Sequence, residues 1–198
     1  MIKRLFDILC ALGGIIILSP LFLIVTLAIK LTSAGGVFFR QARVGQNEKI
    51  FRIHKFRTMV TNAEAHGLKI TVGRDPRITR IGYLLRKTKL DELPQLIDVL
   101  LGDMSLVGPR PEVPEYIQFY PPEIRKKVFS VRPGITDEAS MIMIDENDIL
   151  SKSSNPEQTY IQEILPLKLS YAVKYVDSHN LLLDISLIVK TVMKIFTR

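Results

Sequence analysis

Two adjacent acidic residues, Asp91 and Glu92, are the side chains in this sequence that most clearly suit chemistry. An apolar stripe at helical spacing follows them, so we expect them at a helix N-terminus, where the helix dipole favours ionised carboxylates. Ionised carboxylates bind Mg²⁺, and one of a pair can act as a nucleophile while its neighbour handles protons. The pair also has a purely structural interpretation, because acidic residues cap helices and offset the dipole.

Two arginines have contexts that suit phosphate binding. Arg110 and Arg132 each lie in a proline-containing turn, and Arg86 lies shortly before the acidic pair. Residues 108–112 cannot form regular structure and predict a rigid turn. A stiff turn presents a guanidinium well for bidentate contact with phosphate. The alternative for each arginine is a surface charge or a helix C-terminal cap.

Residues 8–29 form an uncharged apolar run that is long enough to cross a bilayer as a helix. Basic residues flank it on both sides, and the positive-inside tendency then places both of its ends on the cytoplasmic side. Proline disrupts helical hydrogen bonding, and a serine hydroxyl can satisfy the carbonyl that is freed. The run therefore predicts a re-entrant membrane helix bent at Ser19 and Pro20, with a straight span as the alternative. A signal peptide does not fit, because no small-residue cleavage site follows.

Size and charge limit what the remainder can be. We expect residues 1–32 to be the membrane anchor and residues 33–198 to be one catalytic domain on the cytoplasmic face, including amphipathic C-terminal helices. A net charge of +7 indicates an anionic partner, either lipid headgroups or a phosphorylated substrate, and no nucleic-acid-binding motif is evident. The single cysteine, Cys10, and three scattered histidines leave no disulfide framework or zinc-ligand spacing.

The residue pattern predicts an α+β fold that is predominantly α. Strands over residues 37–39 and 49–56 form a β-hairpin. In the helix that begins at Asp91, we expect Thr88 or Asp91 to cap, Pro94 to occupy the first turn and Gly102 to end it. The last helix is apolar enough to lie on a membrane, although an ordinary core helix fits equally well. The predicted helices cover residues 58–69, 78–86, 91–101, 113–119, 122–129, 158–176 and 181–196.

Several motifs in order give the chain a resemblance to a known family, the monotopic bacterial phosphoglycosyl transferases, also called bacterial sugar transferases. The resemblance extends over nearly the whole length. Its carriers are Lys3-Arg4-Leu5-Phe6-Asp7, the apolar run with Ser19-Pro20, Lys55-Phe56-Arg57-Thr58-Met59, Leu90-Asp91-Glu92-Leu93-Pro94-Gln95-Leu96, residues 102–111 (GDMSLVGPRP) and Arg132-Pro133-Gly134-Ile135-Thr136.

The resemblance implies transfer of a sugar 1-phosphate from a UDP-sugar to polyprenyl phosphate, releasing UMP, as the first membrane step of glycan assembly at the bacterial inner membrane. It also implies that Asp91 is the nucleophile of a covalent phosphosugar intermediate. Glu92 would then position Mg²⁺ or assist proton removal, with both carboxylates as metal ligands. Arg86, Arg110 and, more weakly, Arg132 would bind the substrate phosphates.

The chain departs from the family pattern after Thr136, where it reads Asp137-Glu138-Ala139-Ser140-Met141. If this segment contacts the donor, we expect an N-acetylated or deoxy amino hexose first, with galactose or glucose next. The chain also lacks the extra N-terminal membrane helices of larger relatives, which predicts the minimal form. A catalytically silent membrane-surface scaffold that recruits glycosyltransferases is the competing hypothesis. Homodimerisation is plausible, although the sequence shows no heptad repeat or obvious interface.

Overall fold

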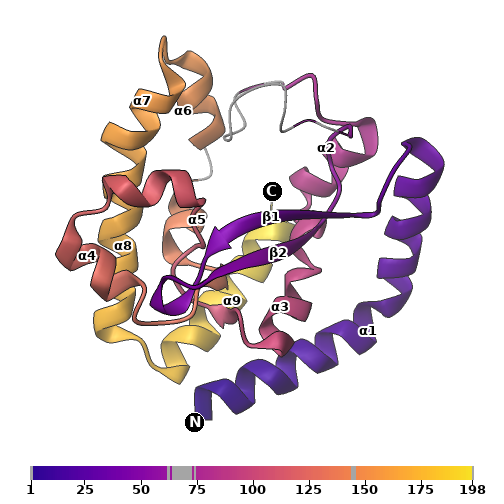
Figure 1. Cartoon of the computed structure of the whole chain (residues 1–198). Coiled ribbons are helices and arrows are strands. Elements are labelled where there is room, and N and C mark those ends of the chain that lie inside the picture. The colour runs from indigo at the N-terminus through magenta and orange to yellow at the C-terminus, as the bar shows by residue number, and fades with distance from the viewer. Residues whose placement is uncertain (1, 62, 64–72, 74, 144–145, 198) are drawn as a thin grey trace.

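A computed structural model describes residues 2–61, 63, 73, 75–143 and 146–197 (Figure 1). Within these residues the chain is mostly helical with small two-stranded sheets, which confirms the predicted α+β class. The helices and strands are α1 (Ile2–Thr32), β1 (Phe38–Val44), β2 (Ile50–Phe56), α2 (Arg80–Lys87), α3 (Gln95–Leu101), β3 (Ser105–Val107), α4 (Pro122–Val128), β4 (Gly134–Thr136), α5 (Glu138–Ile142), α6 (Glu146–Lys152), α7 (Pro156–Thr159), α8 (Leu165–Ser178) and α9 (Leu181–Phe196). Tighter 3₁₀ turns cover Gln46–Glu48, Leu90–Glu92 and Pro114–Phe119, and a π-helical turn covers Tyr160–Ile164.

Helix α1 is continuous but changes direction part-way along its length (Figure 1). Pro20 lies inside it and has no N–H to donate to the carbonyl of Ile16. The Ser19 hydroxyl donates to that carbonyl instead, at 2.8 Å. Ser19 therefore performs the role that the sequence predicted for it.

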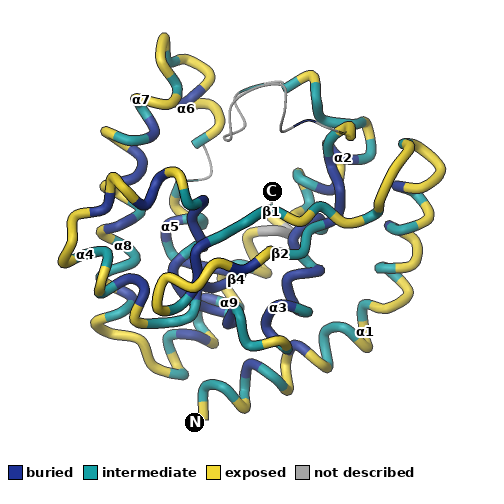
Figure 2. Tube along the Cα trace, viewed as in Figure 1, coloured by how far each residue is buried: buried dark blue, intermediate teal, exposed yellow. Residues whose placement is uncertain are grey.

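One face of α1 packs on the rest of the chain and the other is exposed and apolar (Figure 2). Ala11, Val25 and Ile29 are buried on the packed face. Among the described residues, α1 is the one helix long and apolar enough to cross a membrane. Its exposed large apolar side chains are Ile2, Leu5, Leu9, Leu12, Ile16, Ile17, Leu23, Ile24, Leu27 and Leu31.

Both ends of α1 are bonded to the same folded body. Near the N-terminus, the Lys3 ammonium donates to Asp184 of α9 at 2.6 Å. Just beyond the C-terminal end, the Arg57 guanidinium donates to the carbonyls of Ser33 and Ala34 at 2.9 and 2.7 Å. These contacts hold the two ends of the bent helix against one domain.

The hairpin of β1 and β2 is confirmed, with Phe38 opposite Phe56 and an antiparallel register. Its first strand runs further than predicted, from residue 38 to 44. The hairpin packs on α3, and the His54–Asp98 pair joins the two. Asp98 accepts the backbone N–H of His54 at 2.8 Å and contacts the His54 ring nitrogen at 2.5 Å. This junction fixes β2 against the helix that follows the acidic pair.

The prediction that a helix starts at Asp91 was wrong in detail. Asp91 and Glu92 occupy the separate 3₁₀ turn, and α3 begins only at Gln95. Thr88 caps no following helix, because its hydroxyl donates back to Leu84 in α2 at 2.8 Å. Lys89 then adopts a left-handed conformation (φ 59°), which interrupts the helical path before the pair. Gly102 ends α3 as predicted, with φ 93°.

The C-terminal helices follow the sequence with two differences. The predicted helix over 158–176 contains the π-helical turn at 160–164, and the predicted helix over 113–119 is a 3₁₀ helix. Asn180 does break the chain, since its side chain accepts the N–H of Leu183 at 2.9 Å and caps α9. Helix α9 buries Leu187 and exposes Leu182, so it has both a core face and an apolar outer face. The predicted helix over 58–69 lies largely outside the described residues.

Two motif glycines meet where the short parallel strands β3 and β4 pair. A Cβ on Gly134 would lie 2.1 Å from the nitrogen of Gly108, and a Cβ on Gly108 would lie 2.4 Å from the carbonyl of Arg132. Only glycine allows this approach. The two proline-containing turns are therefore locked together by backbone contact.

Candidate active site

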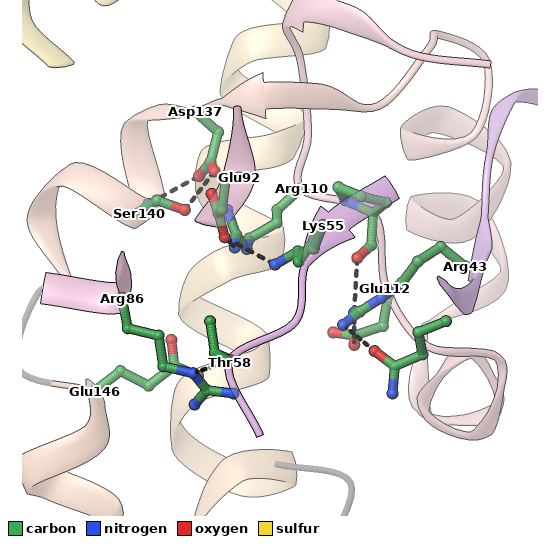
Figure 3. Close-up of polar contacts among 12 residues, drawn as sticks. Arg43, Lys55, Thr58, Arg86, Glu92, Arg110, Glu112, Asp137, Ser140 and Glu146 are labelled. Carbon is green, nitrogen blue, oxygen red and sulfur yellow. Dashed lines mark hydrogen bonds and ion pairs between the residues drawn. The ribbon is translucent and has the colours of Figure 1, made fainter. Parts of the chain in front are cut away.

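The acidic pair lies in the interior despite its charge, since Asp91 is 8% and Glu92 9% exposed. Buried carboxylates require compensation. For Glu92 it comes from two cations: the Lys55 ammonium donates to Oε1 at 2.8 Å, and the Arg110 guanidinium contacts both carboxylate oxygens (Figure 3). Lys55 comes from β2 and Arg110 from the rigid turn after β3, so the two cations reach Glu92 from different parts of the fold.

The two neighbouring carboxylates have opposite electrostatic environments. Burial raises the pKa of Glu92, but Arg110 and Lys55 outweigh it and hold that pKa well below its usual range. Burial also raises the pKa of Asp91, where the attraction of Lys55 is too weak to reverse it and Glu92 adds repulsion. Glu92 therefore stays ionised. The protein stabilises the ionised form of Asp91 less than that of Glu92.

Asp91 has a side-chain oxygen without a partner. Within the described part of the chain, its Oδ1 is buried and accepts no hydrogen bond. A carboxylate that served as a helix cap would accept a backbone N–H, yet the following helix, α3, begins after Pro94 without a side-chain cap. A buried acceptor without a donor is costly, so its retention indicates a role in binding or chemistry.

The pair suits a Mg²⁺ ion that is bound jointly by protein and substrate. It suits less well a Mg²⁺ ion that has protein ligands alone. The described residues contain no group of three or more metal-ligating side chains. Mg²⁺ usually takes one or two carboxylates together with substrate phosphates. The unpartnered oxygen of Asp91 suits this, whereas Oε1 of Glu92 is already engaged by Lys55 and Arg110. The geometry favours Asp91 as the ligand.

Arg86 projects from α2 toward the same region and is held by the segment after β2. Its Nε donates to the hydroxyl of Thr58 at 2.8 Å. Gly82, one turn earlier, lets α2 approach closely, because a Cβ there would lie 1.9 Å from the carbonyl of Thr58. Burial lowers the pKa of Arg86, and Asp91 opposes that effect. Thr58 therefore positions both the helix and its arginine.

The turn that carries Arg110 is fixed by a buried network. Glu112 accepts the phenolic O–H of Tyr160 and the backbone N–H of Val113, the latter at 2.9 Å. The Arg43 guanidinium donates to the carbonyl of Pro111 at 3.0 Å. Tyr160 begins the π-helical turn, a feature that often accompanies functional sites.

The third predicted arginine lies elsewhere. The Nε of Arg132 donates to the carbonyl of Gly102 at 2.8 Å, at the C-terminal end of α3. It lines neither of the two cavities described below. The structure therefore brings Arg86 and Arg110 to the acidic pair and leaves Arg132 as a contact between a turn and a helix end.

Two cavities share wall residues beside this pair. The larger, of about 900 Å³, lies among α2, α5, α6 and α8, and the smaller, of about 760 Å³, lies against the hairpin and contains Asp91 and Glu92 in its wall. Both have the size of small-molecule sites. The cations that line both are Arg43, Arg86, Lys89 and Arg110.

The whole chain matches one known protein family. The model of the family described as bacterial sugar transferase matches residues 1–198. The chain belongs to the bacterial sugar transferase family. The acidic pair and the two cavities thus belong to a chain of that family.

Relatives in several bacteria are similar over essentially the whole of this transferase. It is 39% identical to the UDP-N-acetylgalactosamine-undecaprenyl-phosphate N-acetylgalactosaminephosphotransferase of Aeromonas hydrophila, covering 99% of this chain and 44% of the relative. It is 37% identical to the exopolysaccharide production protein PSS of Rhizobium leguminosarum bv. phaseoli, covering 100% and 96%. It is 34% identical to the UDP-glucose:undecaprenyl-phosphate glucose-1-phosphate transferase of Escherichia coli K12, covering 99% and 40%. The chain thus spans less than half of the first and third relatives.

Sequence reasoning missed several residues of this transferase site. Lys55 stood within a motif, but nothing in its neighbours indicated that it pairs with Glu92, 37 residues away. Glu112 lay in the predicted rigid turn, but nothing in the sequence indicated its bond to Tyr160 or the contact between Arg43 and this turn. Their roles arise from contacts between segments that are distant in the sequence.

Proposed function

We propose that this transferase moves a sugar 1-phosphate from a UDP-sugar to polyprenyl phosphate, giving a polyprenyl-diphosphate sugar and UMP. The observation that supports it most directly is the buried Asp91 with an unpartnered oxygen, beside a Glu92 that Lys55 and Arg110 already neutralise. A nucleophile needs a lone pair that no donor occupies. Charge compensation of its neighbour lets it ionise.

The proposed chemistry uses the two carboxylates differently. An oxygen of Asp91 attacks the β-phosphorus of the donor, and the bond from that phosphorus to the bridging oxygen breaks, so that UMP leaves with the electron pair. A phosphate oxygen of the lipid then attacks the same phosphorus, and the bond to Asp91 breaks, which restores the carboxylate. Glu92 keeps Arg110 and Lys55 in place throughout.

The shared cations would act on the phosphates. Arg86, Lys89 and Arg110 line the boundary between the cavities, where a diphosphate would meet Asp91. Positive charge fixed in position stabilises charge that shifts to a leaving phosphate. Mg²⁺, when bound, would be held by the oxygen of Asp91 that does not attack, and would supply further positive charge beside the diphosphate.

A membrane position on the cytoplasmic face of the bacterial inner membrane follows as part of the proposal. The two ends of α1 contact the same domain, through Lys3 with Asp184 and through Arg57 with Ser33. A straight span would carry those ends to opposite sides of the bilayer and would separate the contacts. The bend at Pro20 and these contacts support a re-entrant anchor, with lipid around its apolar outer face.

The decisive experiment is intact-protein mass measurement on the detergent-solubilised chain with Mg²⁺ and a panel of UDP-sugars, without lipid acceptor. We expect an adduct of one phosphosugar that maps to Asp91 and is absent from Asp91→Asn. UMP release that needs added polyprenyl phosphate, with no adduct from any donor, would contradict the covalent step. The panel should begin with N-acetylated and deoxy amino hexoses and continue with galactose and glucose.

The scaffold hypothesis makes the opposite prediction. A silent scaffold would keep its function in Asp91→Asn. That variant replaces one carboxylate oxygen of Asp91 by an amide NH₂ group and leaves the ion pairs of Glu92 intact. The transferase would lose nearly all activity. The unpartnered oxygen of Asp91 favours the enzyme.

A further inference from the structure

The walls of the two cavities differ in chemistry. Every tyrosine of the chain lines the larger cavity, four of them buried and two accessible. Tyr171 on α8 is one of the accessible rings. One turn before it, Lys168 forms an ion pair with Glu146 of α6 at 2.8 Å. The six tyrosines are Tyr83, Tyr116, Tyr120, Tyr160, Tyr171 and Tyr175.

The wall of the larger cavity also carries acidic groups. Asp137 and Glu146 line the same cavity as Arg110, the cation that contacts Glu92. Asp137 caps α5 by accepting the N–H of Ser140 at 2.8 Å (Figure 3). Both acidic residues and the serine line the cavity. This wall offers aromatic faces, hydroxyls and paired charges.

The wall of the smaller cavity combines three phenylalanines with the acidic pair and several cations. The phenylalanines are Phe38, Phe39 and Phe56, and Arg40 is an exposed cation of the same wall. The ring of Phe56 also packs against Phe22 of α1, with centroids 5.4 Å apart. One aromatic side chain thus joins the cavity wall to the apolar helix.

We propose that the larger cavity binds the nucleotide sugar and that the smaller cavity admits the lipid phosphate, with the phosphates of both held on the shared cations. The inference rests on the proposed transferase function. The tyrosines of the larger cavity offer aromatic faces on which a uracil ring can stack, and its polar groups can hydrogen-bond to sugar hydroxyls. The phenylalanine wall beside α1 suits the isoprenoid.

Matched variants test the assignment, because each wall carries cations that the other lacks. Lys168→Gln alters only the larger cavity and Arg40→Gln only the smaller. Tyr171→Ala, with Tyr171→Phe as its ring-preserving control, gives a second probe of the larger cavity that leaves the Lys168–Glu146 pair intact. The readouts are the KM for the UDP-sugar, the KM for polyprenyl phosphate and the Kd for UMP by titration calorimetry on the full chain.

We expect Lys168→Gln and Tyr171→Ala to raise the donor KM and the UMP Kd about tenfold, with the acceptor KM unchanged. Tyr171→Phe should resemble the wild type. Arg40→Gln should raise the acceptor KM alone. An acceptor KM raised by the larger-cavity variants, or donor KM and UMP Kd unchanged in both, would overturn the assignment. A wild type that binds UMP but releases none from any UDP-sugar would refute the transferase function, and the UMP affinities would still decide which cavity takes the nucleotide.

Discussion

Replacing each member of the acidic pair by its amide should change stability in opposite directions. Glu92→Gln leaves two buried cations, Lys55 and Arg110, without their counter-charge. Breaking a buried pair in this way costs about 3–5 kcal/mol, and for a chain of this size each kcal/mol shifts Tm by about 2–4 °C. We therefore expect Tm to fall by roughly 6–20 °C.

Asp91→Asn should leave Tm unchanged or raise it by about 2–4 °C while it abolishes activity. The reason is that burial raises the pKa of Asp91, so its ionised form opposes folding near neutral pH, and no hydrogen bond to Oδ1 is lost. Thermal unfolding followed by circular dichroism in detergent, with UMP release on the same samples, measures both quantities. If Asp91→Asn lowered Tm as much as Glu92→Gln, Asp91 would be a structural residue and the functional reasoning would be refuted.

Three further outcomes follow from the contacts. Lys55→Met should move the acid limb of the kcat/KM pH profile to higher pH, because Lys55 lowers the pKa of Asp91 and its loss lets that pKa rise; an unmoved limb would show that Asp91 does not control it. Tyr160→Phe should lower kcat severalfold while the donor KM changes little, because loss of the bond to Glu112 loosens the turn that carries Arg110. Steady-state kinetics tests this, and a variant that is less stable but has a normal kcat would contradict it. Pro20→Leu should straighten α1 and weaken membrane retention of an active enzyme, measured as activity in the membrane fraction after carbonate washing, with an unchanged fraction as the contrary result.

Local features of the sequence were read correctly where local forces determine them. Pro20 removes a donor from its own helix whatever surrounds it, and Ser19 lies within reach of the freed carbonyl. The hairpin strands and the helix end at Gly102 follow from residue alternation and from the freedom of glycine. The acidic pair was likewise located, but not its conformation, because the left-handed Lys89 had no sequence signal.

Only the tertiary structure decided how the two carboxylates differ. In the sequence Asp91 and Glu92 are equivalent neighbours. In the fold Lys55 and Arg110 converge on Glu92, and an oxygen of Asp91 has no partner among the residues that the structure describes. Arg132 resembled Arg110 as a proline-turn arginine, yet it bonds to Gly102 instead. Charge pairing depends on distances between segments that are far apart in the chain, and a buried charge is stabilised only by the partners that the fold brings within a few ångströms. The sequence by itself therefore determined which groups could react. The packing of β2, the rigid turn and α2 determined that Asp91, and not Glu92, keeps an oxygen available for reaction.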